Sequence, residues 1–148
     1  MNYIKLGEKE GARLVCGGKR LNRKGYFIDT TIFADVKDEM TIAKEEIFGP
    51  VMSIMKFKTI DEVIERANNS DYGLVAGIVS KSMDNILEIS NALRTGQVFV
   101  NTWIATNTTT PFGGFKNSGL GRELGKHGLR EYLESKTVII KRPDHSLP

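Results

Sequence analysis

The sequence predicts an α/β fold with a parallel βαβαβ core. Three observations support this class. Between residues 51 and 101, three short apolar runs alternate with two amphipathic helical patterns, the runs are apolar almost throughout, and the first helical pattern begins with a capping signal. Strands joined by helices in this order form parallel sheets through right-handed crossovers. Continuous apolar strands are typical of parallel sheets that are covered on both faces.

The first strand and helix of this core cover residues 51–69. The run VMSIMKF at 51–57 is apolar and has the length of a strand. Thr59 and Glu62 then have the spacing of a capping box, whose side chains satisfy free N–H groups of the first helical turn. Apolar residues follow at the helical spacing: Ile60, Val63, Ile64 and Ala67. The polar stretch NNSDYG at 68–73 is expected to end this helix.

A second strand and helix and a third strand complete the core. Residues 74–80, LVAGIVS, form the second apolar run. A helix is expected over 82–94, with three residues facing inward: Ile86, Ile89 and Leu93. Gly96 stands where a helix often ends with a glycine in the left-handed conformation. The third strand is expected over 97–101, QVFVN.

The flanks of the core are less regular. Residues 12–17 and 25–34 are expected to form strands on either side of a basic turn, and 136–141 to form a terminal strand. No low-complexity segment or linker divides the chain. Its 148 residues suffice for one domain with a real core and fall short of two. We therefore expect one α/β domain, or one piece of a larger domain.

Composition and charge exclude several classes of function. Hydrophobic residues make up 40% and charged residues 26%, as in ordinary globular proteins. The net charge of +3 arises from interspersed signs, and the basic cluster at 19–24 is interpreted as a solvated turn rather than a nucleic-acid surface. No apolar run approaches the ~18 residues of a membrane span. The first ten residues lack the apolar stretch of a signal peptide. We expect neither nucleic acid nor a membrane as partner.

The glycine-rich stretch TPFGGFKNSGLGREL at 110–124 invites comparison with phosphate-binding loops. A P-loop requires lysine where this chain has Leu120, and Lys116 lies inside the loop instead. A dinucleotide fingerprint requires its third glycine at Leu124, one residue before Gly125, and a preceding strand. Both motifs fail. The glycines are better explained by close packing of irregular backbone beside a site.

Four segments, in order, resemble the aldehyde dehydrogenase superfamily. They are KEEIFGP at 44–50, NSDYGLVAG at 69–77, VFVN at 98–101 and the glycine loop at 110–125. The resemblance covers essentially the whole chain. It implies the C-terminal portion of the aldehyde dehydrogenase fold, with part of the catalytic domain at 1–135 and the terminal oligomerisation strand and tail at 136–148.

The family resemblance implies NAD(P)-dependent oxidation of an aldehyde to a carboxylic acid. In that chemistry a cysteine thiolate attacks the aldehyde, hydride passes to the nicotinamide, and a glutamate activates water. The family's cysteine segment, its base and its Rossmann-like domain are not found in this sequence. Cys16, the single cysteine, is interpreted as a buried structural thiol. No catalytic residue is therefore assigned, and the chain is expected to be inactive alone.

The EEIFGP segment carries the cofactor residues that the resemblance implies. Glu46 is assigned to the nicotinamide ribose, because a carboxylate accepts hydrogen bonds from both hydroxyls of a diol. Phe48 is assigned to an apolar wall beside the nicotinamide. The structural alternative is an acid pair, Glu45 and Glu46, at a helix end and a buried Phe48. Neither NAD nor NADP is favoured by these residues.

The glycine loop and the segment before it carry the substrate residues implied by the resemblance. Phe112 matches a position that lines the aldehyde tunnel, and its alternative is core packing. Thr106 falls where the family varies its substrate wall. Trp103, with its neighbour Ile104, is expected near the tunnel mouth. Glu123 corresponds to an acid near the hydrolytic water and its proton path, and its alternative is an ion pair with Arg122.

Assembly, metal binding and location complete the expectations. The resemblance implies a homo-oligomer in which the strand from Lys136 to Lys141 joins a neighbouring subunit. The alternative to an enzyme part is a non-catalytic assembly module or truncated relative that self-associates through this edge; a self-sufficient mononucleotide binder is a third. His127 and His145 lack the spacing of a metal site. A cytoplasmic location is expected, and an organellar matrix is also compatible. The identity of the aldehyde does not follow from these residues.

Overall fold

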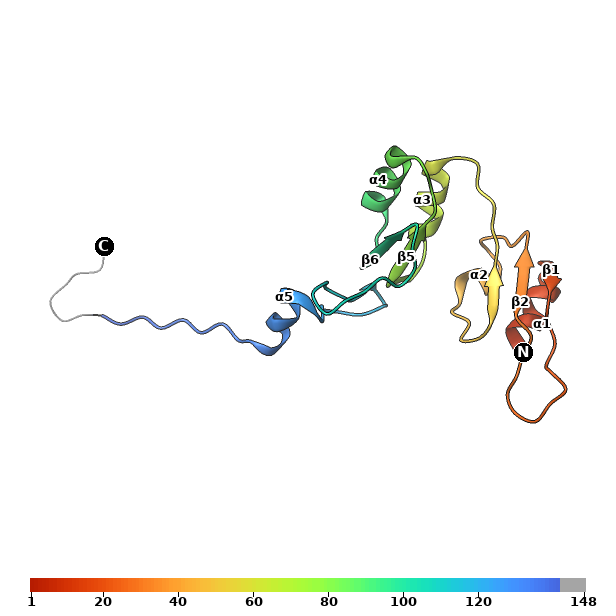
Figure 1. Cartoon of the computed structure of the whole chain (residues 1–148), viewed down its shortest axis with the longest axis horizontal. Coiled ribbons are helices and arrows are strands. Elements are labelled where there is room, and N and C mark those ends of the chain that lie inside the picture. Colours follow the sequence, from red (N-terminus) through yellow and green to blue (C-terminus); the bar gives the residue numbers. More distant parts are fainter. Residues whose placement is uncertain (142–148) are drawn as a thin grey trace. The chain divides into compact units, whose positions relative to one another are not determined.

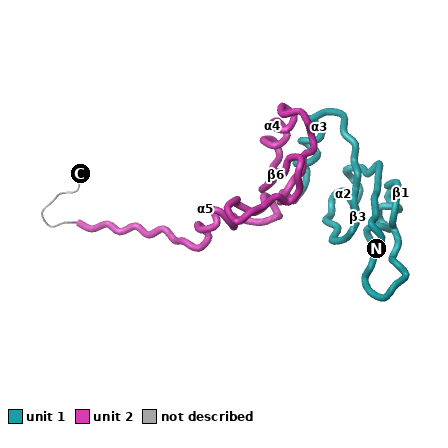
Figure 2. Tube along the Cα trace, in the orientation of Figure 1, with its two compact units in different colours: residues 1–70 teal, residues 71–148 magenta. Residues whose placement is uncertain are grey.

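The computed structural model describes residues 1–141, and the chain folds into two compact units (Figures 1 and 2). Unit 1 comprises Met1–Ser70 and unit 2 comprises Asp71–Pro148. The boundary between the two units falls inside the predicted βαβαβ core. The boundary sits just after a helix end and carries no glycine- or proline-rich linker, so composition does not reveal it.

Unit 1 is built around a three-stranded sheet. Its elements are α1 (Asn2–Lys9), β1 (Arg13–Cys16), β2 (Thr31–Ala34), α2 (Thr41–Lys44), β3 (Val51–Ser53) and α3 (Ile60–Asn68). The strand order is β1-β2-β3, with β2 antiparallel to β1 and parallel to β3. β2 is therefore the central strand, as its almost complete burial indicates. The expected strands on either side of the basic turn are confirmed, although both are shorter than predicted.

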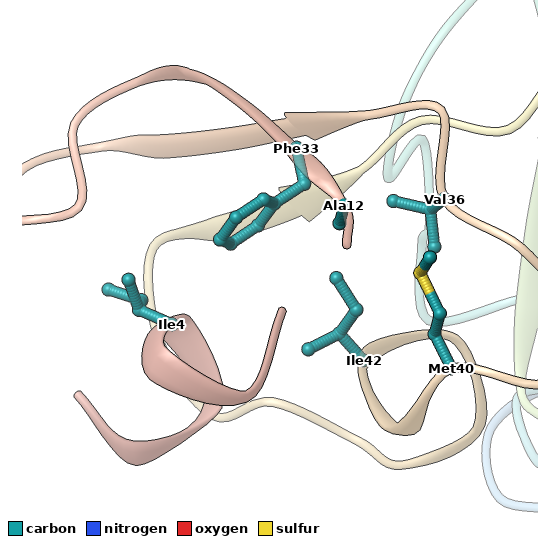
Figure 3. Packing of buried hydrophobic residues seen from close by; sticks show 6 residues of the cluster. All are labelled: Ile4, Ala12, Phe33, Val36, Met40 and Ile42. Atoms are coloured by element: carbon teal, nitrogen blue, oxygen red, sulfur yellow. The ribbon is translucent and has the colours of Figure 1, made fainter. Parts of the chain in front are cut away.

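The core of unit 1 lies between the sheet and the helices α1 and α2. Phe33 on β2 is fully buried, with 0% of its surface exposed, and six buried side chains converge there (Figure 3): Ile4, Ala12, Phe33, Val36, Met40 and Ile42. Gly7 of α1 lets the helix approach, because a Cβ at this position would lie 3.0 Å from the Phe33 ring and from Ile42. The sheet and both helices are thereby held as one body.

The capping box at the start of α3 is confirmed. The Thr59 hydroxyl accepts a hydrogen bond from the Glu62 N–H at 3.2 Å, and the Glu62 carboxylate accepts one from the Lys58 N–H at 2.8 Å. Arg66 then connects α3 to the rest of unit 1. Its guanidinium donates to both carboxylate oxygens of Asp38 and to the Lys56 carbonyl. Such a bidentate pair fixes the direction of a helix more firmly than a single surface ion pair does.

Unit 2 contains two small sheets. Its elements are β4 (Tyr72–Gly73), β5 (Val75–Ile78), α4 (Met83–Ala92), β6 (Gln97–Val100), β7 (Phe115–Lys116), α5 (Gly125–Gly128) and the 3₁₀-helix η1 (Leu129–Tyr132). β5 and β6 are parallel and are connected by α4, which Ser82 caps by accepting from the Asn85 N–H. β4 and β7 are antiparallel. The α/β class and the parallel pairing across a helix are confirmed.

The three strands predicted for the core do not form one sheet. β3 pairs with β2 of unit 1, whereas β5 and β6 pair with each other in unit 2. The apolar runs predicted correctly where strands occur. Which strands pair with each other depends on the strand edges that the rest of the fold leaves open. That information is not local to any of the three runs.

Gly96 is not the helix cap that its position suggested. Helix α4 ends at Ala92, and Leu93 at the C-cap is extended. A Cβ on Gly96 would overlap the carbonyl oxygen of Gly113. Gly96 is therefore required because the glycine loop passes directly over its Cα, and the backbone needs no left-handed conformation there.

Four helices were not anticipated, namely α1, α2, α5 and η1, and one expected strand is not formed. Neither α1 nor α2 has a side-chain N-cap, so the strongest sequence signal of a helix start is missing in both. Residues 136–141 are exposed and form no strand within the described part of the chain. An edge strand requires a partner, and none of the described residues provides one. No helix among them is long and apolar enough to cross a membrane.

Candidate functional site

The EEIFGP segment of unit 1 forms a tight, anchored turn between α2 and β3. The Gly49 N–H donates to the Ile47 carbonyl at 2.9 Å, and the Val51 N–H donates to the Gly49 carbonyl at 2.8 Å. The Pro50 carbonyl accepts from the N–H of Thr31 at 2.8 Å, which ties the turn to the central strand β2. This local bonding gives the side chains of the turn defined positions on a rigid base.

The two acids of this segment have different surroundings. Glu45 accepts a hydrogen bond from the Tyr3 hydroxyl at 2.9 Å, so it joins the turn to α1. The exposed Glu46 carboxylate has no hydrogen bond or ion pair with any of residues 1–141. The structural interpretation thus applies to Glu45 alone. Glu46 remains available to a ligand.

Phe48 lies in the solvent. Its side chain is 94% exposed, which contradicts the alternative of a buried core phenylalanine. An exposed phenylalanine ring and a free carboxylate, two residues apart, suit a ligand in which a sugar carries an aromatic ring. The carboxylate would accept hydroxyl hydrogen bonds, and the ring would give an apolar wall.

In unit 2, the glycine loop joins Phe112 directly to Glu123. The Phe112 N–H donates to the Glu123 carbonyl and the Glu123 N–H donates to the Phe112 carbonyl, both at 2.8 Å. This reciprocal pair fixes the backbone of both residues. The half-buried Phe112 side chain and the exposed Glu123 side chain therefore have a defined spacing, which the sequence could not reveal across ten intervening residues.

Arg122 organises the loop around this pair. Its guanidinium donates to the Gly114 carbonyl at 2.9 Å and to the Gly121 carbonyl at 2.6 Å, and it lies over the Phe115 ring at 5.1 Å. No ion pair links Arg122 to Glu123 within the described residues. The alternative of an ion pair between these neighbours is therefore not formed, because the arginine donates to backbone carbonyls instead. Sequence reasoning missed this role, although an arginine among glycines is a recognisable donor for open loop carbonyls.

The glycine loop surrounds a hollow of about 300 Å³ in unit 2. The lining comprises Leu74, residues 112–114, 118–123 and Glu131. Several backbone N–H groups of the lining are engaged: those of Phe112, Ser118, Gly119 and Glu123 donate to nearby carbonyls. Two glutamates, Glu123 and Glu131, line the same space. Occupied donors and negative charge both oppose phosphate binding, which supports the rejection of a phosphate loop.

The remaining substrate candidates lie between β6 and the glycine loop. The Trp103 ring meets the Phe99 ring edge-on, with centroids 5.8 Å apart, and covers Gly77. It is nevertheless 60% exposed, so one face of the indole is free. Ile104 and Thr106 are exposed as well. All of these residues belong to unit 2, whereas Glu46 and Phe48 belong to unit 1.

The single thiol and His127 show no catalytic or metal-binding arrangement with the other residues of the described range 1–141. Cys16 is exposed at the end of β1, so the expectation of a buried thiol is wrong. The four-residue strand turns it outward, and its nearest hydrogen-bond acceptor is the Thr30 carbonyl at 3.8 Å. His127 is exposed in α5, and His145 lies outside the described residues. Residues 1–141 contain no group of three side chains able to hold a metal ion.

Comparison with known proteins identifies the family. The model of the aldehyde dehydrogenase family matches residues 1–138. The chain is 57% identical over 143 residues to retinal dehydrogenase 2 of Gallus gallus, covering 97% of this chain and 28% of that protein. It is 56% identical over 141 residues to aldehyde dehydrogenase 1A1 of Mesocricetus auratus, covering 95% and 28%.

Solved structures agree with this result. An NAD+ complex of aldehyde dehydrogenase from Bacillus cereus superposes with a TM-score of 0.87 at 50% identity, covering 90% of this chain and 27% of that one. The NAD+ complex from Mycobacterium tuberculosis gives 0.89 at 44% identity, covering 98% and 30%. The chain thus spans under a third of the length of these relatives. The family model matches nearly the whole of this chain, residues 1–138. The chain therefore belongs to the aldehyde dehydrogenase family.

Proposed function

We propose that this chain serves NAD(P)-dependent oxidation of an aldehyde to a carboxylic acid, as the C-terminal part of an aldehyde dehydrogenase catalytic domain. The observation that carries the proposal is the free carboxylate and exposed ring of Glu46 and Phe48 on an anchored turn, within a segment whose solved relatives include NAD+ complexes. A cytosolic location is proposed with it, because one relative, 56% identical, is named a cytosolic aldehyde dehydrogenase of Mus musculus.

Glu46 and Phe48 would hold the nicotinamide riboside. The Glu46 carboxylate would accept hydrogen bonds from the ribose hydroxyls, and the Phe48 ring would cover an apolar face of the base. When bound, the cofactor supplies the hydride acceptor of the oxidation. The turn needs no rearrangement to offer these groups, because its backbone is already bonded to β2 through Thr31 and Pro50.

Unit 2 would supply part of the aldehyde wall. Phe112, Trp103 and Thr106 would give it an apolar and variable surface, and the reciprocal bonds between Phe112 and Glu123 would keep a carboxylate beside that wall. A carboxylate in this position can hold and pass a proton during hydrolysis of the intermediate. The sulfur nucleophile is not assigned to Cys16, because its thiol faces the Thr30 carbonyl, which cannot act as a base, and the Arg13 guanidinium of the same strand is paired with Asp35.

A chimeric enzyme tests the proposal. The matched segment of chicken retinal dehydrogenase 2 is replaced by the 143 aligned residues of this chain, and NAD+-dependent aldehyde oxidation is measured. We expect activity, and we expect Glu46→Gln to raise the KM for NAD+ about tenfold, since a neutral amide is a weaker acceptor for two hydroxyls. Tyr26→Ala, at an almost fully exposed residue between β1 and β2, is the control. An active chimera in which Glu46→Gln leaves this KM unchanged would refute the cofactor role.

An assembly function is favoured by a separate observation. Val138, Ile139 and Ile140 are between 66% and 80% exposed in an extended segment with no partner strand in the described chain. Such a segment is suited to strand addition to a second copy or to a larger subunit. Sedimentation of the 148-residue chain should show self-association that Ile139→Pro weakens, because proline removes a ladder donor. A monomeric wild-type chain at tens of micromolar would refute it.

A further inference from the structure

Glu131 of the 3₁₀-helix η1 packs against the glycine loop at Gly121 and Arg122. Its carboxylate oxygen Oε1 accepts the Arg122 N–H at 3.4 Å. A Cβ placed on Gly121 would lie 2.8 Å from the same oxygen and 2.9 Å from the Glu131 Cδ. The carboxylate therefore rests on the bare Cα of Gly121. A side chain at residue 121 would displace the carboxylate from this position.

The helix that carries Glu131 is itself held close to the loop. Gly128, at the end of α5, is buried, and a Cβ there would lie 3.1 Å from the carbonyl carbon of Glu123. Its N–H donates to the Leu124 carbonyl at 3.0 Å. Two glycines, one on each side of the contact, thus let α5 and η1 approach the segment 121–124. The position of Glu131 follows from this packing.

The contact is connected to Phe112 by a short path. Arg122, whose N–H faces Glu131, donates through its guanidinium to the Gly114 carbonyl. The next residue, Glu123, exchanges two hydrogen bonds with Phe112. Displacement of the backbone at 121–122 would therefore disturb both attachments of the Phe112–Gly114 segment. The Glu131 carboxylate, the Arg122 guanidinium and the hydrogen bonds between Phe112 and Glu123 thus all hold the backbone of the same short loop.

We infer that Glu131 is a positioning residue, which sets the backbone at Gly121 and Arg122 and through it the placement of Phe112 and Glu123. The inference that this placement serves an aldehyde rests on the proposed function; the contact and its effect on the loop do not. The hydrogen bond of 3.4 Å is long, so much of the effect comes from the carboxylate packed on Gly121. Glutamine keeps this shape and its acceptor oxygen, whereas alanine loses both.

Amide hydrogen exchange of the 148-residue chain tests the inference without any need for activity. In Glu131→Ala, we expect the Phe112 and Glu123 amides to exchange about tenfold faster, as when a contact worth one hydrogen bond is lost. Glu131→Gln should stay within about twofold of the wild type. The Asn101 amide, which donates to the Ile78 carbonyl at 2.8 Å, should be unchanged and serves as the internal reference. Glu88→Ala, at an exposed acid of α4, is the matched control.

Three results would overturn the inference. The first is unchanged exchange of Phe112 and Glu123 in Glu131→Ala. The second is an equal rise at Asn101, which would indicate general loosening of unit 2 and no specific positioning. The third is an equal loss of protection in Glu131→Gln, which would show that shape and acceptor are irrelevant.

The chimeric enzyme separates this inference from the proposed function. There Glu131→Ala should raise the KM for the aldehyde several-fold and leave the KM for NAD+ within about twofold, with rescue by Glu131→Gln. An unchanged aldehyde KM would overturn the link between Glu131 and the substrate wall. An inactive chimera would count against the proposed function, and the exchange experiment would still decide whether Glu131 positions the loop.

Discussion

Replacing Gly96 by alanine should destabilise unit 2 and displace the glycine loop. The added methyl group would overlap the Gly113 carbonyl oxygen, which is backbone and cannot rotate away. Either the loop or the start of β6 must move. Two hydrogen bonds are at risk from that movement: the Gly96 N–H to the Gly73 carbonyl at 3.1 Å, and the Gln97 Nε2 to the Pro111 carbonyl at 3.2 Å.

The size of the effect can be estimated from these contacts. Overpacking of an ordered region costs about 1–3 kcal/mol. Loss of one of the two hydrogen bonds adds about 1 kcal/mol. We therefore expect the free energy of unfolding to fall by about 2–4 kcal/mol, a large fraction of the ~5–15 kcal/mol that stabilises a typical domain.

Urea unfolding followed by tryptophan fluorescence measures this change in the relevant unit. Trp103 is the only tryptophan, and it packs against Phe99 of β6, so its emission reports on unit 2. Gly96→Asn separates the two explanations for this glycine, since asparagine is accepted at left-handed helix ends but is larger than alanine. If Gly96→Ala and Gly96→Asn both stay within about 0.5 kcal/mol of the wild type, the close-packing argument is refuted. Gly49→Ala, with no neighbouring atom closer than 4.0 Å, is the control, followed by circular dichroism.

Two further predictions concern unit 1. Phe33→Ala should lower the free energy of unfolding by about 3–5 kcal/mol, because it empties the centre of the buried cluster; circular dichroism in urea measures this loss, and a change below about 1 kcal/mol would contradict it. Stability should also fall in acid. The hydrogen bond from the Lys58 N–H, with help from Arg66, lowers the pKa of Glu62 below its usual 4.5, and Arg13 and then Lys56 lower the pKa of Asp35 below its usual 3.8. Both contributions to stability are complete above those usual values and are lost as the pH falls through the lowered pKa values. The urea concentration at the unfolding midpoint should therefore decrease when the pH is taken below about 4.5. In Glu62→Gln this midpoint should depend less steeply on pH.

Local signals made α3 and α4 predictable. Thr59 and Ser82 each accept a hydrogen bond from an N–H three residues later, and that geometry depends only on neighbours in sequence. The pairing of β3 with β2 is different, because the strands are joined across some twenty residues and their partners depend on the whole unit. Helix α1 has no side-chain N-cap, so the signal that marked the start of α3 is missing there.

The candidate site was predictable in its residues and not in its geometry. The family resemblance named Phe112 and Glu123, but their reciprocal hydrogen bonds and the role of Arg122 arise from the path of the loop. Exposure was the least predictable property. Cys16 was expected to be buried, although a thiol at the end of a four-residue strand has few neighbours to cover it.

The exposure of Phe48 is unusual for so large an apolar side chain. A phenylalanine is normally buried because transfer of its ring from water is worth about 1.5–3 kcal/mol. Phe48 gains almost none of this, although Ile42 a few residues earlier is almost fully buried in the core of the same unit. The turn from Glu45 to Val51 is held by backbone bonds that need no help from the ring. A large apolar side chain that contributes so little to its own unit is best explained by a surface or ligand that covers it, and the neighbouring free carboxylate of Glu46 favours a ligand with hydroxyl groups.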